Sequence, residues 1–288
     1  MFLPPSFSQM RENRSSGKEV ESKLAPMEIE TRMEVLERST ICQLVKEIVG
    51  FVLYMHQQIP SVLQNLEVEF DSLKEERKNL ESVQVQAEIK ATSRREHSAR
   101  VRDVKQRISS LEKLMNNISD LLSAFEITLN EIPEVSAIVL MLGGSPLRPL
   151  HVYELSFSHG RYVLEKEMNS NNSRAADLLS KKAIRALLSS GAGSVSYAGP
   201  MKLFLLVRAP TAFNLPQHFL PKRDFRYSKK VSPSRLHIKC RNLNQETSKS
   251  LQDNDTSSLL ESASNDMIWF QCKHTIKGLA LKSPFLGE

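Results

Sequence analysis

Apolar residues in the first half of the chain recur at three- and four-residue steps, the spacing of one face of a helix. The first such run begins beside Ser39 and Thr40, either of which could cap a helix, and Pro60 stops it. We therefore expect a helix from about residue 39 to residue 58. Its apolar positions are Ile41, Leu44, Val45, Ile48, Val49, Val52 and Leu53.

Residues 62–97 are rich in charged side chains and have few apolar positions, so we interpret them as a charged insert. Residues 98–128 carry a long apolar stripe, which predicts a second helix, and Pro133 closes the connection after it. The stripe is wider than the seam of a strict heptad repeat, which favours packing on a sheet. A coiled coil over residues 62–128 is the alternative.

After Pro133 the hydrophobic period becomes that of strands. Residues 136–142 are continuously apolar, as in a strand covered on both faces, and residues 151–157 alternate. With a turn from Gly143 to Pro146, these two segments predict an antiparallel hairpin. A helix is expected next over residues 173–189, ending at Gly191. Further strands are expected at 202–208, 235–240 and 267–272, with residues 275–276 as a continuation.

This order of elements predicts an α+β fold, with helices packed on one mostly antiparallel sheet. Residues 1–38 are polar and contain several prolines, so we expect a disordered N-terminal tail. Residues 39–288 are expected to form a single domain. Within it, residues 241–264 are mostly polar and predict a flexible loop.

Composition argues against most catalytic classes. The chain has only 10 glycines, and Gly143-Gly144-Ser145 is followed by proline instead of a helix, so this motif predicts a turn and not a phosphate loop. The histidines show no HxH or HxxxH spacing, and the three cysteines lie far apart in the sequence. We therefore expect no enzyme activity, no metal and no cofactor.

Charge and hydropathy indicate the setting in which the protein works. The formal net charge of +6 is spread along the chain, a weak indication of an acidic partner. No apolar segment is long enough to cross a membrane, and the N-terminus lacks the apolar core of a signal peptide. We expect a soluble protein of the nucleus and cytoplasm without a membrane partner.

Four segments, taken in order, resemble the Comet family of spindle-checkpoint proteins. The first is the helix ending Leu53-Tyr-Met-His-Gln-Gln-Ile-Pro60, and the second is Ile138-Val-Leu-Met-Leu-Gly-Gly144 followed by Tyr153-Glu-Leu155. The third is Phe219-Leu-Pro-Lys222 with Phe225-Arg226 just beyond it. The fourth is Ile268-Trp-Phe-Gln271 together with Ile276-Lys-Gly278. Together the four segments bracket residues 40–280.

The resemblance implies a HORMA fold and an adaptor function. Comet-like proteins bind the closed form of the Mad-two checkpoint protein and present it to a Pch-two-type AAA+ ATPase, which remodels it and silences the spindle checkpoint. Meiotic HORMA proteins would be a second class of client. The charged insert at residues 62–97 departs from the family pattern.

The resemblance also assigns client contacts to two helices. The helix from Ser173 to Ser189 would form the interface, with Ile184 at the position where the family has an aromatic anchor and Arg185 and Leu187 beside it. Met55 occupies a contact position that the family usually fills with glutamine. Burial of Ile184 in the core is the alternative interpretation.

Two further roles come from the same resemblance. Pro221 and Lys222 would contact the ATPase, with Pro221 holding a rigid loop outside the sheet. Residues 267–271, including Ile268, Trp269 and Phe270, would add to a sheet edge as a C-terminal safety belt that closes the domain on itself. A solvated connection and an ordinary edge strand are the respective alternatives.

Two other classes of function stay open at this stage. The first is a structural protein that dimerises through a coiled coil over residues 62–128. The second is a nucleic-acid-binding protein, suggested by a cluster of cations that lacks the interleaved stacking aromatics typical of that class. The cluster consists of Lys222, Arg223, Arg226, Lys229 and Lys230.

Overall fold

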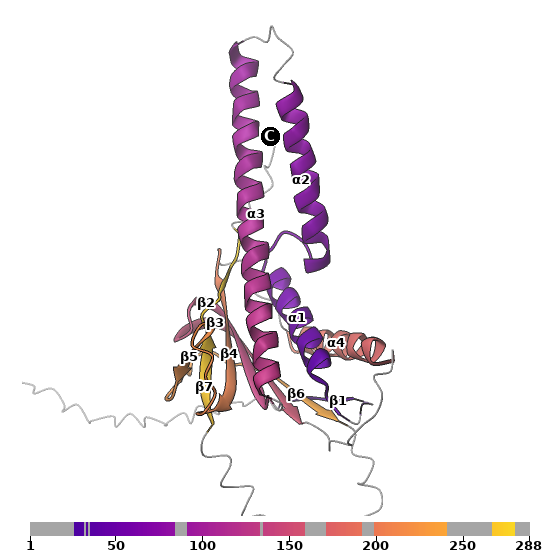
Figure 1. Ribbon diagram of the computed structural model, residues 1–288, viewed down its shortest axis with the longest axis vertical. Coiled ribbons are helices and arrows are strands. Elements are labelled where there is room, and N and C mark those ends of the chain that lie inside the picture. The colour runs from indigo at the N-terminus through magenta and orange to yellow at the C-terminus, as the bar shows by residue number, and fades with distance from the viewer. Residues whose placement is uncertain are drawn as a thin grey trace, which may run out of the picture.

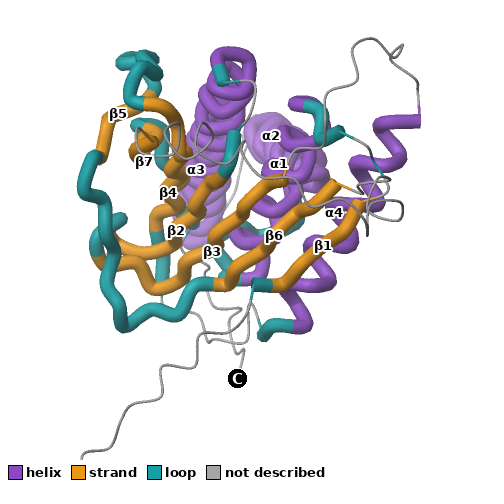
Figure 2. The backbone as a smooth tube through the Cα atoms, turned by 90° about the horizontal axis from the view of Figure 1, so that it is seen from below, coloured by secondary structure: helices purple, strands orange, loops and turns teal. Residues whose placement is uncertain are grey.

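The computed structural model describes residues 26–31, 33, 35–83, 91–132, 135–158, 171–191, 199–240 and 267–279. Within these residues, helices cover one face of a sheet, and two helices extend from it as a long arm (Figure 1). Figure 2 shows the same sheet with the helices behind it. The predicted α+β fold class is confirmed.

Helix α1 (Arg38–Met55) lies where the apolar periodicity predicts it, and its apolar face is fully buried. The predicted cap is wrong. Glu37 occupies the N-cap position, no side-chain cap bond forms, and Thr40 is buried within the helix. After Met55 the chain turns sharply, with Gln57 at φ 53°, before Pro60.

Helices α2 (Leu63–Val83) and α3 (Ala91–Glu131) form the arm, so the charged insert is helical over its described residues. The two helices run antiparallel, and ion pairs join Arg100 to Glu76 at 2.9 Å and Lys105 to Glu81 at 3.9 Å. The later part of α3 enters the domain core, where its Phe125 is fully buried. One helix therefore serves both the arm and the core.

The sheet has the strand order β1-β6-β3-β2-β4-β7-β5, and β8 also pairs with β4. The β1–β6 and β6–β3 pairs are parallel, whereas the other pairs are antiparallel. The strands are β1 (Met27–Thr31), β2 (Ala137–Ser145), β3 (Arg148–Ser158), β4 (Lys202–Pro210), β5 (Phe219–Lys222), β6 (Ser234–Cys240), β7 (Met267–Cys272) and β8 (Ile276–Lys277).

Two predictions about the edges of the sheet are wrong, and one alternative interpretation is excluded. The predicted tail contains β1, whose Met27 and Thr31 pair with Leu236 and Cys240 of β6. The predicted Phe-Leu-Pro-Lys loop is strand β5, paired with β7, so Pro221 is part of the sheet. Proline cannot donate a ladder hydrogen bond, which explains why it is found in an edge strand. Strand β7 lies between β4 and β5 and is therefore not an edge strand.

The β2–β3 hairpin is tighter than the sequence suggests. Its turn is formed by Pro146 and Leu147, and Gly143 and Gly144 belong to β2. The register shifts on both sides of Gly143, which marks a bulge. A Cβ atom at Gly143 would lie 2.9 Å from the backbone nitrogen of Leu150, so the close approach of the two strands requires glycine there.

The sheet has a second apolar cluster, the outer cluster, on the face away from the helices. Buried side chains of β2, β3 and β4 form it, and the segment after β5 covers them with Phe225, Tyr227 and Val231. Trp269 of β7 also packs here, while the neighbouring Phe270 points into the main core. Each face of the central strands is therefore covered.

Candidate functional site

Helix α4 (Asn171–Ser189) presents an apolar and cationic face to solvent. Ala183 and Leu187 on its inner side are fully buried, and α4 packs against α1. On its outer side Leu178 and Leu188 are 61% and 46% exposed. The exposed Lys181 lies three residues after Leu178 and seven residues before Leu188, so the three side chains share the outer side of the helix. Large exposed leucines flanked by cations form a surface suited to a protein partner.

The structure separates the predicted client contacts of α4. Ile184 is half-buried at the edge of the outer face, and Arg185 is exposed on it. Leu187 is fully buried in the main core, so its assignment as a contact is wrong. Leu187 follows Ala183 by four residues, which places the two on the same inner side of the helix.

One contact with β1 anchors α4 on the domain, and a glycine ends the helix. The Lys182 ammonium donates to the backbone oxygen of Glu30 in β1 at 2.9 Å, so the unexpected strand β1 supports this helix. At the C-terminus of α4, Gly191, with φ 83°, donates its N–H to the Leu188 carbonyl and ends the helix. The glycine conformation is typical of a helix C-terminus.

The end of α1 brings together groups from distant parts of the chain. Tyr54 is 45% exposed and Met55 is half-buried. The buried His56 shares a 2.7 Å hydrogen bond with the Tyr153 hydroxyl, and its ring lies 3.9 Å from that of His151. Burial, followed by the neighbouring His151, lowers the pKa of His56 to about 4, so the ring is neutral at physiological pH.

Gln58 is a fully buried connection between three segments. Its amide nitrogen donates to the carbonyl oxygens of His56 at 2.7 Å and Gly199 at 3.2 Å. Its amide oxygen accepts the Met201 N–H at 2.6 Å, and its backbone oxygen accepts the Leu279 N–H at 2.8 Å. The end of α1, the start of β4 and the C-terminal residues are therefore held together by one side chain and its backbone.

The predicted belt residues have three different environments. Phe270 is buried and meets Phe213 edge-on, with ring centroids 4.9 Å apart. Trp269 packs on the outer cluster, and Ile268 is half-buried against the main core. Strand β7 pairs with a strand on each side, so it closes the domain without forming an edge of the sheet. After it, β8 returns to pair with β4.

A basic segment, residues 222–230, begins at the last residue of β5 and runs along the outer sheet face. Arg226, Lys229 and Lys230 are exposed, while Phe225 and Tyr227 hold the backbone on the outer cluster. The Tyr227 hydroxyl donates to the Glu154 carboxylate at 2.5 Å, and Glu154 also forms an ion pair with Arg235 at 2.8 Å. Burial and the Glu154 carboxylate raise the pKa of Tyr227 far above its usual range. The cations are therefore carried on an ordered backbone.

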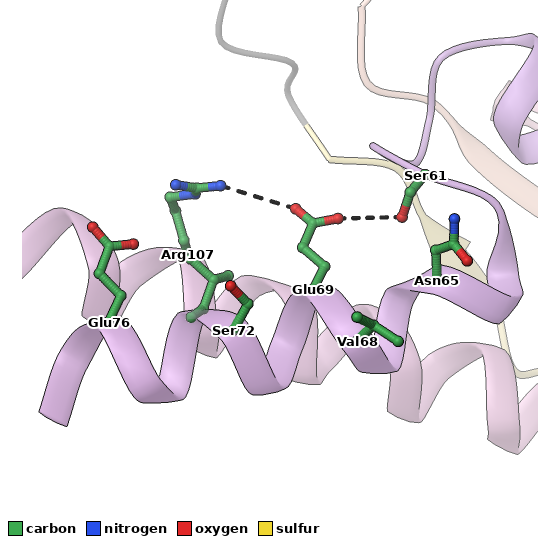
Figure 3. A pocket seen from close by; sticks show the side chains of 8 residues that line it. Ser61, Asn65, Val68, Glu69, Ser72, Glu76 and Arg107 are labelled. Atoms are coloured by element: carbon green, nitrogen blue, oxygen red, sulfur yellow. Dashed lines mark hydrogen bonds and ion pairs between the residues drawn. The ribbon is translucent and has the colours of Figure 1, made fainter. Parts of the chain in front are cut away.

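A hollow of about 560 Å³ lies on the arm, near the base of α2 (Figure 3). Glu69 accepts a 3.2 Å hydrogen bond from Ser61 and pairs with Arg107 at 3.9 Å across the arm. Apart from Val68 and Leu73, its walls are polar, so it lacks the apolar lining typical of small-molecule pockets. In the described part of the chain no group of three or more His, Cys, Asp or Glu side chains could hold a metal ion.

Across the helices that the structure describes, none is both long and apolar enough to cross a bilayer.

Sequence reasoning did not identify the exposed residues Leu178, Leu188 and Tyr54. Periodicity groups apolar residues, but two leucines on the polar side of α4 look like weakly placed core positions. The available signal was that Leu178 lies three residues before Lys181 and Leu188 lies three residues after Arg185. This spacing indicates an exposed binding face only once the inner side of the helix is known.

Comparison with known proteins identifies one family. The family model for p31comet, described as Mad1 and Cdc20-bound-Mad2 binding, matches residues 32–281. The matched range includes α1, α4, the basic segment and β7. No curated protein matches the chain at a significant level.

Proposed function

Because the chain belongs to the p31comet family, we propose that it is a non-catalytic adaptor that binds closed Mad2 and presents it to a Pch-two-type AAA+ ATPase. Mad2 and the Mad-two checkpoint protein are the same protein. The outer face of α4 carries this proposal, since it exposes Leu178 and Leu188 beside two cations. Meiotic HORMA proteins are proposed as further clients, and the nucleus and cytoplasm as the places of action.

The client surface is proposed to include both exposed leucines and Ile184. An exposed helical leucine contributes little to folding, so its replacement tests binding with small effects on stability. A buried apolar anchor at the centre of an interface costs about 2 kcal/mol or more when removed, which weakens binding roughly 30-fold. Replacing both Leu178 and Leu188 by aspartate should therefore abolish capture of closed Mad2.

Leu147 provides the matched control for this experiment. It is 64% exposed, comparable to Leu178 at 61%, but lies at the β2–β3 turn. Leu147→Asp should bind Mad2 like the parent, and circular dichroism should be unchanged for every variant. Affinity is measured by isothermal titration calorimetry. Parental affinity in the double variant would contradict the assignment of α4 as the client surface.

The ATPase is proposed to dock on Pro221, Lys222 and the basic segment that follows. Lys222 pairs with Trp269 in the sheet, so its position is set by two strands. Cations displayed on a fixed backbone favour rapid, oriented encounter with an acidic surface. Pro221→Ala combined with Lys222→Glu should preserve Mad2 binding while ATPase recruitment and client reopening are lost.

Salt and a second charge reversal complete this test. Raising ionic strength should partly reproduce the recruitment defect, because exposed charges are screened. Lys202 is exposed and lies at the end of β4 that does not pair with β7. Lys202→Glu should therefore leave recruitment intact. If the double variant supports reopening at the parental rate, the ATPase docks elsewhere.

A further inference from the structure

The sequence contains two copies of the motif Ser-Pro-x-Arg, one starting at Ser145 and the other at Ser232. Proline-directed protein kinases phosphorylate a serine that precedes proline, and many favour a basic residue two positions after that proline. A third Ser-Pro pair, at Ser283, lacks the basic residue and lies outside the described residues. Sequence alone does not distinguish the first two copies.

The structure folds the first copy into a tight hairpin turn. Ser145 is the last residue of β2 and pairs with Arg148 across the two-residue turn. It is half-buried, Pro146 and Leu147 form the turn, and Arg148 begins β3, so the four residues of the motif are bent through the hairpin and are not extended. A kinase binds its substrate as an extended segment. Engaging Ser145 would require opening the hairpin.

The second copy has the geometry that the first lacks. Ser232 is exposed and lies between the turn at residues 228–231 and the start of β6 at Ser234. Neither Ser232 nor Pro233 belongs to a strand. The Arg235 side chain stays 38% exposed despite its ion pair with Glu154. The serine and the proline therefore lie outside the sheet, and the arginine side chain at the start of β6 stays partly exposed.

We propose that Ser232 is a phosphorylation site for a proline-directed serine/threonine kinase. The Ser232 hydroxyl oxygen attacks the γ-phosphorus of ATP, a new oxygen–phosphorus bond forms, and the bond to the departing ADP breaks. The hydroxyl proton passes to the base of the kinase. This inference rests on the proposed function, because it assigns regulation to the proposed ATPase-docking segment.

The consequence of the modification follows from local charge. The basic segment carries five cations against the carboxylate of Asp224, a net charge of +4. A phosphoserine adds about −1.5 to −2 charges at neutral pH, which removes roughly half of that excess. Ser232 directly follows Val231, one of the side chains that hold this segment on the outer cluster. Phosphorylation should therefore weaken ATPase docking and leave the client surface of α4 unaffected.

The experiment uses the full chain, a purified cyclin-dependent kinase and magnesium ATP. Phosphate incorporation is mapped by mass spectrometry in the parent and in Ser232→Ala, Pro233→Ala and Ser145→Ala. We expect modification at Ser232 in the parent and in Ser145→Ala, and none at this position in Pro233→Ala. Absence of phosphate at Ser232, or equal labelling of Ser145, would overturn the assignment.

Recruitment assays then test the regulatory part. Protein phosphorylated only at Ser232 should recruit the ATPase about three- to tenfold more weakly than untreated protein, with unchanged Mad2 affinity. Phosphatase treatment should restore recruitment. If charge reversal at Lys222 abolishes recruitment but the phosphate changes nothing, the regulatory inference fails alone. If charge reversal has no effect, the proposed docking site fails, whereas the mapping of Ser232 still decides whether the site is modified.

Discussion

At the scale of single residues, the packing of Gln58 against Gly278 leaves no room for a side chain at residue 278. A Cβ atom at Gly278 would lie 2.1 Å from the Gln58 amide oxygen and 2.9 Å from its Cβ. Because Gln58 is fully buried and hydrogen-bonded on both sides of its amide, it cannot move aside cheaply. Gly278→Ala should lower the free energy of unfolding by about 1–3 kcal/mol, measured by urea denaturation.

Gly144→Ala is the matched control, since no atom lies within 4 Å of the position of its Cβ. Its stability should stay within about 0.5 kcal/mol of the parent. The cost of Gly278→Ala should shrink when Gln58 is also replaced by alanine, because the two residues are in contact. Equal costs in both backgrounds would show that another group sets the limit at Gly278.

At the scale of elements, β7 is predicted to be among the most protected strands despite its late position in the chain. It pairs with β4 and β5, and it places Phe270 in the main core. Backbone amides buried between two strands exchange only when the sheet opens. Hydrogen exchange of residues 268–272 should therefore be as slow as that of β4.

Deleting residues 265–288 tests the same point. The deletion removes the strand that pairs with β5 and uncovers Phe213 and Phe219, so the product should aggregate. A chain that lacks only residues 280–288 is the control and should remain soluble. A monomeric 1–264 product with parental stability would contradict the closing role of β7 and β8.

The elements also show how far the sequence predicts this fold. Helices α1, α3 and α4 and strands β2, β3, β4, β6 and β7 follow from periodicity, because each buries a regular set of apolar side chains. Strands β1 and β5 do not. They have five and four residues in polar or proline-containing surroundings, and distant partners stabilise them.

The candidate site was less predictable than the fold. Whether Leu187 or Leu188 faces solvent depends on how α4 sits against α1, and one residue of helix rotation exchanges their roles. Likewise, the basic segment looks like a solvated loop until the contacts of Phe225 and Tyr227 with the outer cluster are known. Both cases depend on contacts between segments far apart in the sequence.

At the scale of the whole molecule, the arm argues against dimerisation through residues 62–128. Leu66 and Leu73 of α2 and Val104 and Leu111 of α3 are buried already within one chain. Ion pairs across the arm further match the two helices to each other. We therefore expect light scattering on the full chain at micromolar concentration to give a monomer mass. A stable dimer, or a dimeric 1–130 fragment, would revive the coiled-coil alternative.

The parallel pairing of β1 with β6 also constrains biosynthesis. Met27 has Leu236 as its partner, so the first strand leaves the ribosome long before the strand it needs has been made. Contacts between such distant segments are slow to form and tend to expose unpaired strand edges in the meantime. The N-terminal strand should thus dock late in folding. Nascent chains that stop before residue 234 should remain substrates for chaperones.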